Sequence, residues 1–221
     1  GPPSWRGGRS TPRWYDHIDD DLQHLRNIGV SVVRWFILAD GLTYGTGEDA
    51  PRLSGWFRRR WHFNPPPLNE EFLRDFGELL ARFAAANEGS AHRIQLLPVF
   101  VDFHFCQPGI TPVTTSEAPG SKTTIPDRAW VKAGRAEAIS HDGKRAHFLD
   151  GALDPLLGAA QRQADVIYAW ELINEPDWVT EGWHPDPGSK PPVRESSMRA
   201  FIEEGSERVR RAGFRSTVGF A

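Results

Sequence analysis

Three apolar segments of the sequence each end in polar side chains that could carry out acid–base chemistry. Arg34 lies in VVRWF, His104 in VDFHF, and Asn174 and Glu175 lie together in ELINEP. A carboxylate at the end of a buried strand is costly unless something uses it. A guanidinium, an imidazole, an amide and a carboxylate around one pocket would suit proton transfer combined with charge stabilisation.

Each of these side chains also has a structural interpretation. Arg34 could form an ion pair with Asp102 or Glu171, and a single histidine at a strand end is more often a hydrogen-bonded structural residue. Asn174 could cap a helix with Glu175 in its first turn, where an acidic residue is favoured. Taken singly, none of the four side chains predicts a site. Whether they can form one depends on the helices and strands that position them.

Helices and strands alternate along the chain. Apolar spacing and end signals predict helices over residues 16–29, 69–89, 148–164 and 194–212. Runs of β-branched and aromatic residues predict strands over residues 30–38, 94–105, 166–173 and 216–220. Glycine, proline and small polar residues predict loops after these strands, at residues 39–67, 106–145 and 177–193. A loop as long as 106–145 inside a compact domain is usually functional.

This alternation predicts an α/β fold with a parallel sheet. Because the long loops follow strands, variable material gathers at the carboxyl ends of the strands, where α/β folds build their sites. We expect residues 1–221 to form one domain that is part of a (β/α)8 TIM barrel. A full barrel takes about 250 residues, so we expect strands two to five here, without strand one and strands six to eight. A small open parallel sheet is the alternative.

Composition excludes several classes of protein. The formal net charge of −3 gives no basic footprint for nucleic acid, and no apolar run is long enough to span a bilayer. Cys106 is the only cysteine, which rules out an internal disulfide and a cysteine-based zinc cluster. A metallohydrolase needs three or four converging ligands, whereas the strand ends offer Asp102 and His104 without an H-x-H pair. We therefore expect no metal, no cofactor, and neither a nucleic-acid nor a membrane partner.

Taken together, the polar strand ends resemble a known set. An Arg at the second strand, a His at the third and Asn-Glu-Pro at the fourth resemble the clan A retaining glycoside hydrolases, above all the cellulase and mannanase family, glycoside hydrolase family 5. The most specific part is AWELINEPDW, because such enzymes often carry a W-E-x-x-N-E-P run at this strand. The likeness extends through RNIGVSVVRWFIL, LLPVFVDFHF, FLDGALDPLLGAA and STVGFA.

This resemblance implies a glycosidase that cleaves a β-linked oligo- or polysaccharide, such as a β-glucan or β-mannan, or a smaller β-glycoside, with retention at the anomeric carbon. Glu175 would be the general acid/base, protonating the leaving oxygen and then activating water. Asn174 would bind the sugar 2-hydroxyl, Arg34 would keep the nucleophile ionised, and His104 would line the subsite where the bond breaks. The resemblance is compatible with a secreted or periplasmic location.

Two tryptophans are further candidates for binding sugar. Trp178 and Trp183 follow shortly after Glu175, and indole rings stack well on the apolar faces of sugars. The alternative for both is a structural lid.

The second carboxylate of a retaining enzyme has no evident place in the sequence. It must lie about 5–5.5 Å from the first, whereas Glu171, four residues before Glu175, would be about 13 Å away along a strand. The resemblance places the nucleophile on the seventh strand, so we expect it outside this chain, which alone would be inactive. The rival interpretation is a non-catalytic carbohydrate-binding barrel, although binding alone gives no reason to keep an Asn-Glu pair at the strand end.

Overall fold

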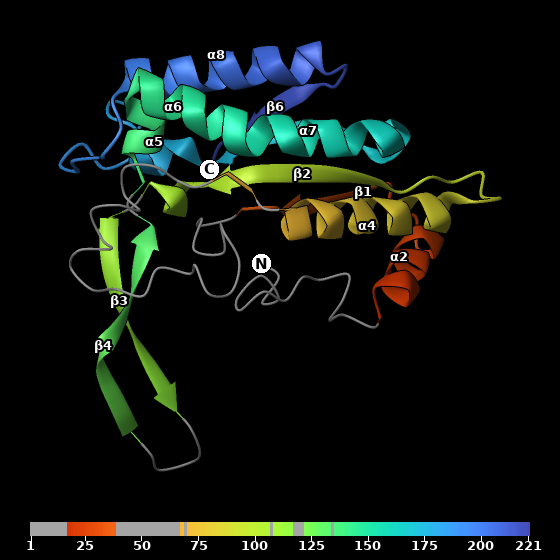
Figure 1. Cartoon of the computed structure of the whole chain (residues 1–221), viewed down its shortest axis with the longest axis horizontal. Coiled ribbons are helices and arrows are strands. Elements are labelled where there is room, and N and C mark those ends of the chain that lie inside the picture. The colour runs from red at the N-terminus through yellow and green to blue at the C-terminus, as the bar shows by residue number, and fades with distance from the viewer. Residues whose placement is uncertain (1–16, 39–66, 69, 107, 117–121, 134) are drawn as a thin grey trace.

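The computed structural model describes residues 17–38, 67–68, 70–106, 108–116, 122–133 and 135–221 (Figure 1). The predicted loop at 39–67 lies almost wholly outside the described residues, as do the first residues of the predicted helices at 16–29 and 69–89. No helix in the described ranges is long and apolar enough to cross a membrane.

A parallel sheet of four strands forms the centre of the fold, in the order β1-β2-β5-β6. These strands are β1 (Val32–Phe36), β2 (Gln95–Asp102), β5 (Trp170–Asn174) and β6 (Ser216–Gly219). All three neighbouring pairs are parallel, and their order in the sheet follows their order in the chain. The prediction of an α/β fold with four parallel strands is confirmed. Within the described residues β1 and β6 are edge strands, and the sheet does not close on itself.

Helices connect and cover the strands. In Figure 1, α2 (Ile18–Asn27) and α4 (Glu70–Asn87) lie below β2, and α6 (Asp142–Phe148), α7 (Asp154–Ala160) and α8 (Glu195–Arg211) lie above it. Neighbouring helices pack on one another, α2 on α4 and α4 on α7, while α8 packs on β5 and β6. Between α6 and α7 runs the π-helical turn Leu149–Leu153, and the 3-10 segment Gln161–Val166 follows α7.

Apolar residues at helical spacing explain why these helices form and which face they bury. The helix α4 buries five residues that recur every three or four positions, namely Phe72, Phe76, Leu79, Leu80 and Phe83. The helix α8 does the same with Met198, Phe201, Gly205 and Val209. A helix with one such stripe is stabilised by packing it against a sheet. The predicted helices at 69–89 and 194–212 are therefore confirmed to within two residues at each end.

Alternate residues of β5 point to opposite faces of the sheet. Trp170 contacts Phe76 of α4, with ring centroids 5.9 Å apart. Leu172 lies against Gly205 of α8. Trp170 and Leu172 therefore share the face that packs on α4 and α8. Glu171, between them, points to the opposite face, which carries the polar residues described below.

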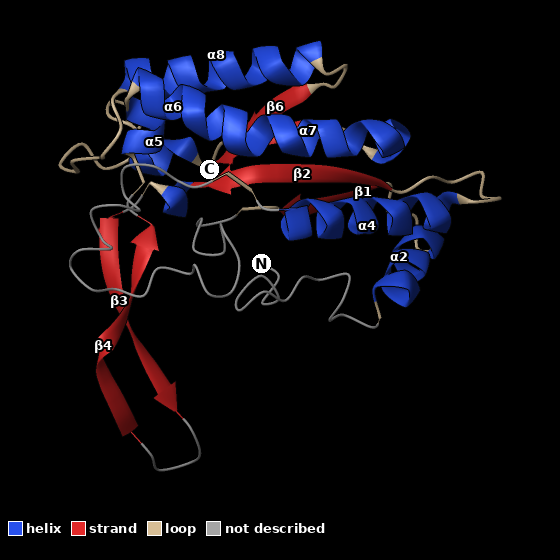
Figure 2. Ribbon diagram, viewed as in Figure 1, coloured by secondary structure: helices blue, strands red, loops and turns tan. Residues whose placement is uncertain are grey.

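The predicted loop over 106–145 is wrong. Its described part contains the strands β3 (Pro108–Ser116) and β4 (Lys122–Ala133), which pair antiparallel, then the short helix α5 (Glu137–Ser140) and the start of α6. Figure 2 shows this hairpin projecting from the rest of the molecule. Glycine and proline suggested a loop, but the segment is also rich in threonine, a β-branched residue that favours strands. Proline occurs at ends and irregularities of pairing, and here the register shifts between Pro112 and Thr114.

The end of the second predicted strand also differs from expectation. The strand β2 ends at Asp102, and Phe103–Phe105 forms a 3-10 turn. His104 therefore lies on this turn rather than on the strand. Cys106 follows directly, fully buried, with its N–H donating to the carbonyl oxygen of Phe103 at 2.9 Å.

Candidate active site

An ion pair crosses the polar face of the sheet from β1 to β5. Arg34 donates from Nε to Oε2 of Glu171 at 2.8 Å and from Nη2 to Oε1 at 2.5 Å. The Glu171 side chain is 3% exposed, whereas that of Arg34 is 40% exposed. Paired bonds of this kind fix the guanidinium plane. The structural interpretation of Arg34 as a partner of Glu171 is thus confirmed, and it leaves part of the guanidinium open to solvent.

The same guanidinium extends the network to the end of β5. Its Nη2 donates to Oδ1 of Asn174 at 2.6 Å, and Nδ2 of Asn174 donates to Oδ1 of Asp102 at 2.8 Å. Asp102 and Asn174 are register partners at the carboxyl ends of β2 and β5. The other carboxylate oxygen of Asp102 bonds to Nδ1 of His104. Five side chains from β1, β2, its following turn and β5 therefore form one continuous hydrogen-bonded chain.

Charge in this network favours the guanidinium cation. Hydrogen bonding to Glu171 raises the pKa of Arg34 against the opposing effect of burial, and the charges of Glu171, Asp102 and Glu175 raise it further. Arg34 thus carries a positive charge at any working pH.

Glu175 adopts an unusual backbone conformation. Its φ of 48° and ψ of 52° lie in the left-handed region, and it is the one non-glycine residue with positive φ in the described part of the chain. Such a conformation costs about 1–3 kcal/mol and persists only where the surroundings enforce it. Here the N–H of Glu175 donates to the carbonyl oxygen of Gly219 on β6 at 2.6 Å. The strand alternation stops at this residue, and the 3-10 turn Pro176–Val179 carries the chain away.

Trp178 belongs to an aromatic group beside the network. Its ring, in a residue 38% exposed, lies 6.4 Å from that of Phe103 and 5.5 Å from the imidazole of His184, which it meets edge-on at 85°. Phe103 in turn packs on His104 at 4.0 Å. Trp178 is therefore placed where a flat ligand that reached His104 could contact it.

Trp183 lies in different surroundings, against α8. Its ring packs on Phe220 at 5.8 Å and under the guanidinium of Arg199 at 5.4 Å, and its side chain hydrogen-bonds Glu195. It lines a cavity of about 400 Å³ together with Arg199, Ile202, Glu203, Val218 and Phe220. The structure thus groups Arg34, His104, Asn174, Glu175 and Trp178, and places Trp183 in a separate cavity at the β6 edge.

Sequence reasoning did not assign three residues that build this arrangement. Asp102 was considered as a partner of Arg34 and as a metal ligand, and Glu171 as a partner of Arg34 and as the second carboxylate, but neither was assigned to the site. Gly219 entered only as part of the predicted strand 216–220. A Cβ atom on Gly219 would lie 3.3 Å from Nη2 of Arg34 and 3.2 Å from Cδ of Glu171, and closer still to Oε1. Glycine is needed there because the ion pair fills the space. The D-x-H spacing of Asp102 and His104 was the one sequence pattern that could have indicated their hydrogen bond.

No set of three or more His, Cys, Asp or Glu side chains in the described ranges could hold a metal ion. The described side chains themselves offer a carboxylate, an amide, an imidazole and a cation.

Comparison with known proteins supports the fold. No family model matches the chain, and no curated protein does. Its fold is similar to that of β-mannanases. The enzyme from the blue mussel Mytilus edulis has a TM-score of 0.58 at 14% identity, with 91% of this chain and 50% of that chain covered.

Two further β-1,4-mannanases give similar values. The β-1,4-D-mannanase of Cryptopygus antarcticus has a TM-score of 0.58 at 14% identity, covering 92% of this chain and 49% of that one. The enzyme of the sea hare Aplysia kurodai has a TM-score of 0.60 at 15% identity, covering 98% and 56%. The chain thus spans about half the length of these enzymes. The likeness indicates a TIM-barrel-like α/β fold, of which the described residues form an open sheet of four parallel strands with its helices.

Proposed function

We propose that this chain is part of the catalytic domain of a retaining glycoside hydrolase, with Glu175 as its general acid/base. The proposal rests on the hydrogen-bonded chain from Arg34 through Asn174 and Asp102 to His104, in which Asn174 directly precedes Glu175, on a fold similar to that of β-mannanases.

Each side chain has a role that its contacts allow. Glu175 protonates the glycosidic oxygen as the bond to the anomeric carbon breaks, and its carboxylate then takes a proton from the water that attacks. Asn174 uses one N–H on Asp102 and keeps the other for the sugar 2-hydroxyl. His104 is left with Nε2 for the ligand, because Nδ1 is engaged by Asp102.

The nucleophile is a separate matter. Glu171 does not fit the role, because both its oxygens accept from Arg34 and its side chain is 3% exposed. Asp102 also has both oxygens occupied. We propose that the nucleophilic carboxylate comes from outside the four strands of the parallel sheet, and that the exposed part of Arg34 keeps it ionised.

For the substrate we propose a β-1,4-linked mannan or a related β-glycan. The neighbours of known structure include β-1,4-mannanases and an exo-β-1,4-mannosidase from an Opitutaceae bacterium. The partly exposed ring of Trp178, backed by Phe103, offers a flat face on which a sugar can stack. Trp183 would contribute only if the chain of sugars reached the cavity at the β6 edge.

The test is Glu175→Gln in a polypeptide that supplies the second carboxylate. Loss of acid catalysis should lower kcat/KM on mannan by about 10²–10⁴-fold. A mannoside with an activated aryl leaving group needs little protonation and should lose far less in the glycosylation step. Equal losses on both substrates would contradict the acid role.

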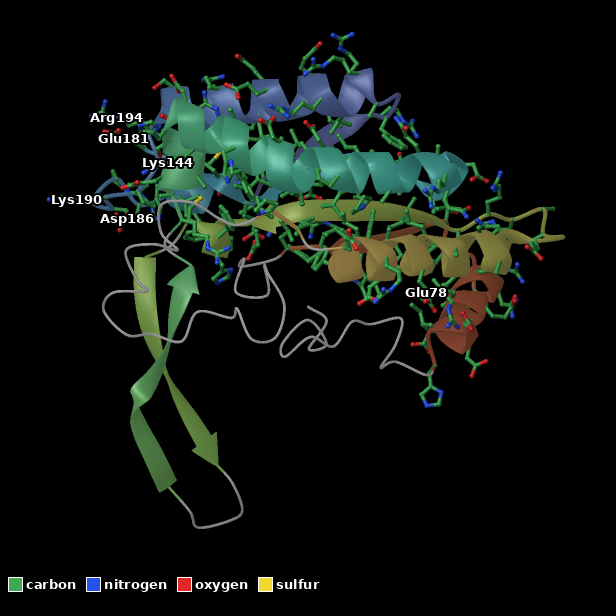
Figure 3. All side chains as sticks on the ribbon, in the orientation of Figure 1. Glu78, Lys144, Glu181, Asp186, Lys190 and Arg194 are labelled. Atoms are coloured by element: carbon green, nitrogen blue, oxygen red, sulfur yellow. The ribbon has the colours of Figure 1, made fainter. Side chains whose placement is uncertain are left out.

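A matched control is available in the next loop. Glu181 is exposed, and Figure 3 shows it at the end of the molecule where β2 terminates. Glu181→Gln makes the same chemical change outside the network and should leave both activities within about two-fold of the unchanged protein, since surface substitutions usually change little.

A non-catalytic carbohydrate-binding protein is the second candidate. The occupation of both Asp102 and Glu171 by hydrogen bonds favours it, because the described site then offers no second free carboxylate. It predicts binding of mannooligosaccharides that Trp178→Ala weakens, without turnover in any longer form of the polypeptide. Hydrolysis abolished by Glu175→Gln would exclude it.

A further inference from the structure

The carboxylate of Asp102 holds two candidate substrate-binding groups at once. Its Oδ1 accepts from Nδ2 of Asn174 at 2.8 Å, and its Oδ2 bonds to Nδ1 of His104. The side chain is 13% exposed, so water competes little for these oxygens. Neither the amide nor the imidazole has a fixed chemical orientation of its own, because an amide can flip and a neutral imidazole has two tautomers.

The orientation of Asn174 follows from the charges on its two sides. The cation of Arg34 donates to Oδ1, and the anion of Asp102 accepts from Nδ2. A flipped amide would place its NH₂ against the guanidinium and its oxygen against the carboxylate, which replaces two favourable contacts with two repulsive ones. Asp102 and Arg34 therefore select one of the two amide orientations.

The tautomer of His104 follows in the same way. A carboxylate can only accept a hydrogen bond, so Nδ1 must carry the proton that it donates to Asp102. In the neutral imidazole Nε2 is then an acceptor. The His104 side chain is 39% exposed, and its ring lies tilted against that of Phe103 with centroids 4.0 Å apart.

We propose that Asp102 is a positioning residue that fixes both the amide orientation of Asn174 and the tautomer of His104. The inference deepens the proposed function and rests on it for its catalytic meaning. Through Asp102, the site presents an N–H donor from Asn174 and a lone pair from His104 Nε2 to the same ligand. Such a pair matches a sugar that offers one hydroxyl oxygen as acceptor and a neighbouring hydroxyl as donor.

The structural test is nitrogen NMR of the 221-residue chain, labelled with 15N and studied above the titration of its histidines. We expect neutral His104 to be the Nδ1–H tautomer in the unchanged protein, and an Nε2–H tautomer there would overturn the proposal without any variant. The variant Asp102→Asn is nearly isosteric but has one acceptor and one donor in place of two acceptors. It cannot accept from both neighbours, so either the His104 tautomer switches or the Asn174 side-chain signals move.

The control Asp177→Asn changes a half-buried acid three residues beyond Asn174. It should alter neither set of signals. Unchanged His104 and Asn174 signals in Asp102→Asn would overturn the proposal.

Activity provides the second arm, in a polypeptide that supplies the second carboxylate. Misplacing both groups should lower kcat/KM on mannooligosaccharides by about 10²-fold. The loss should be strongly sub-additive with Asn174→Ala, because both changes remove the same contact. If no variant or parent hydrolyses glycosides while the NMR changes occur, the proposed function fails and the positioning role stands. An active parent with unchanged kinetics in Asp102→Asn would refute the positioning role alone.

Discussion

Gly219→Ala should destabilise the protein by displacing the Arg34–Glu171 ion pair. The added Cβ would lie 3.2 Å from Cδ of Glu171 and 3.3 Å from Nη2 of Arg34, and would overlap Oε1 of Glu171. Such contacts can be relieved cheaply only when the neighbour is a flexible side chain. Glu171 is not flexible, because it is 3% exposed and Arg34 holds both of its oxygens, at 2.8 and 2.5 Å.

The magnitude has two parts. Overpacking a filled site costs about 1–3 kcal/mol, and displacing the carboxylate removes a charge-assisted hydrogen bond worth about 1.5–3 kcal/mol. The second part is reduced because Arg34 is 40% exposed and water replaces some of the lost contact. We expect a loss of about 3 kcal/mol, which for a chain of this size lowers Tm by roughly 6–12 °C.

Thermal and urea unfolding followed by circular dichroism measure this effect. Gly77→Ala is the matched control, because its Cβ would meet nothing within 4 Å in the middle of α4 and should stabilise by about 0.5–1 kcal/mol. In a Glu171→Ala background the added Cβ at Gly219 should cost little, since the clashing group is gone. A Gly219→Ala protein that melts within about 2 °C of its parent, a loss of about 1 kcal/mol or less, would refute the reasoning.

Two further predictions follow from α8 and its contacts. Gly205→Ala should destabilise the protein by about 1–2 kcal/mol, because the new Cβ would lie 3.0 Å from the side chain of Leu172 on β5. As a control, Gly158→Ala should raise the urea midpoint, because its Cβ would meet nothing within 4 Å. Hydrogen bonds from Arg199 and then Trp183 lower the pKa of Glu195. The stability they contribute is thus present above the ordinary carboxyl pKa of about 4.3 and lost as pH falls through the lowered value. Tryptophan fluorescence should change in that acid range, and the change should be absent in Glu195→Gln.

Local patterns predicted the helices and strands well. The five buried apolar residues of α4 recur at helical spacing within a single segment, so no distant contact is needed to see its buried face. The hairpin of β3 and β4 was missed for the opposite reason. Its strands are defined by pairing with each other, and composition alone does not distinguish a threonine-rich strand from a loop.

The site was predictable in part. Asn174 and Glu175 lie at the carboxyl end of β5, as expected, and parallel neighbours bring such ends together. Arg34 instead lies in the middle of β1 and reaches Asn174 through its long side chain. Which partner each would take did not follow, because the pairing of Asp102 with Asn174 depends on the register between β2 and β5. The left-handed backbone of Glu175 was also beyond local rules, since those rules place such conformations at glycine.

The single thiol of the chain offers a direct measure of how firmly the His104 turn is held. Cys106 ends that turn in full burial, and burial raises the pKa of its thiol. A buried, protonated thiol does not react with disulfide or maleimide reagents, so labelling requires local opening of the Phe103–Phe105 turn. The labelling rate therefore reports the opening free energy of the turn separately from global unfolding. A ligand that contacts His104 should slow that rate, which gives a binding assay that requires no catalysis.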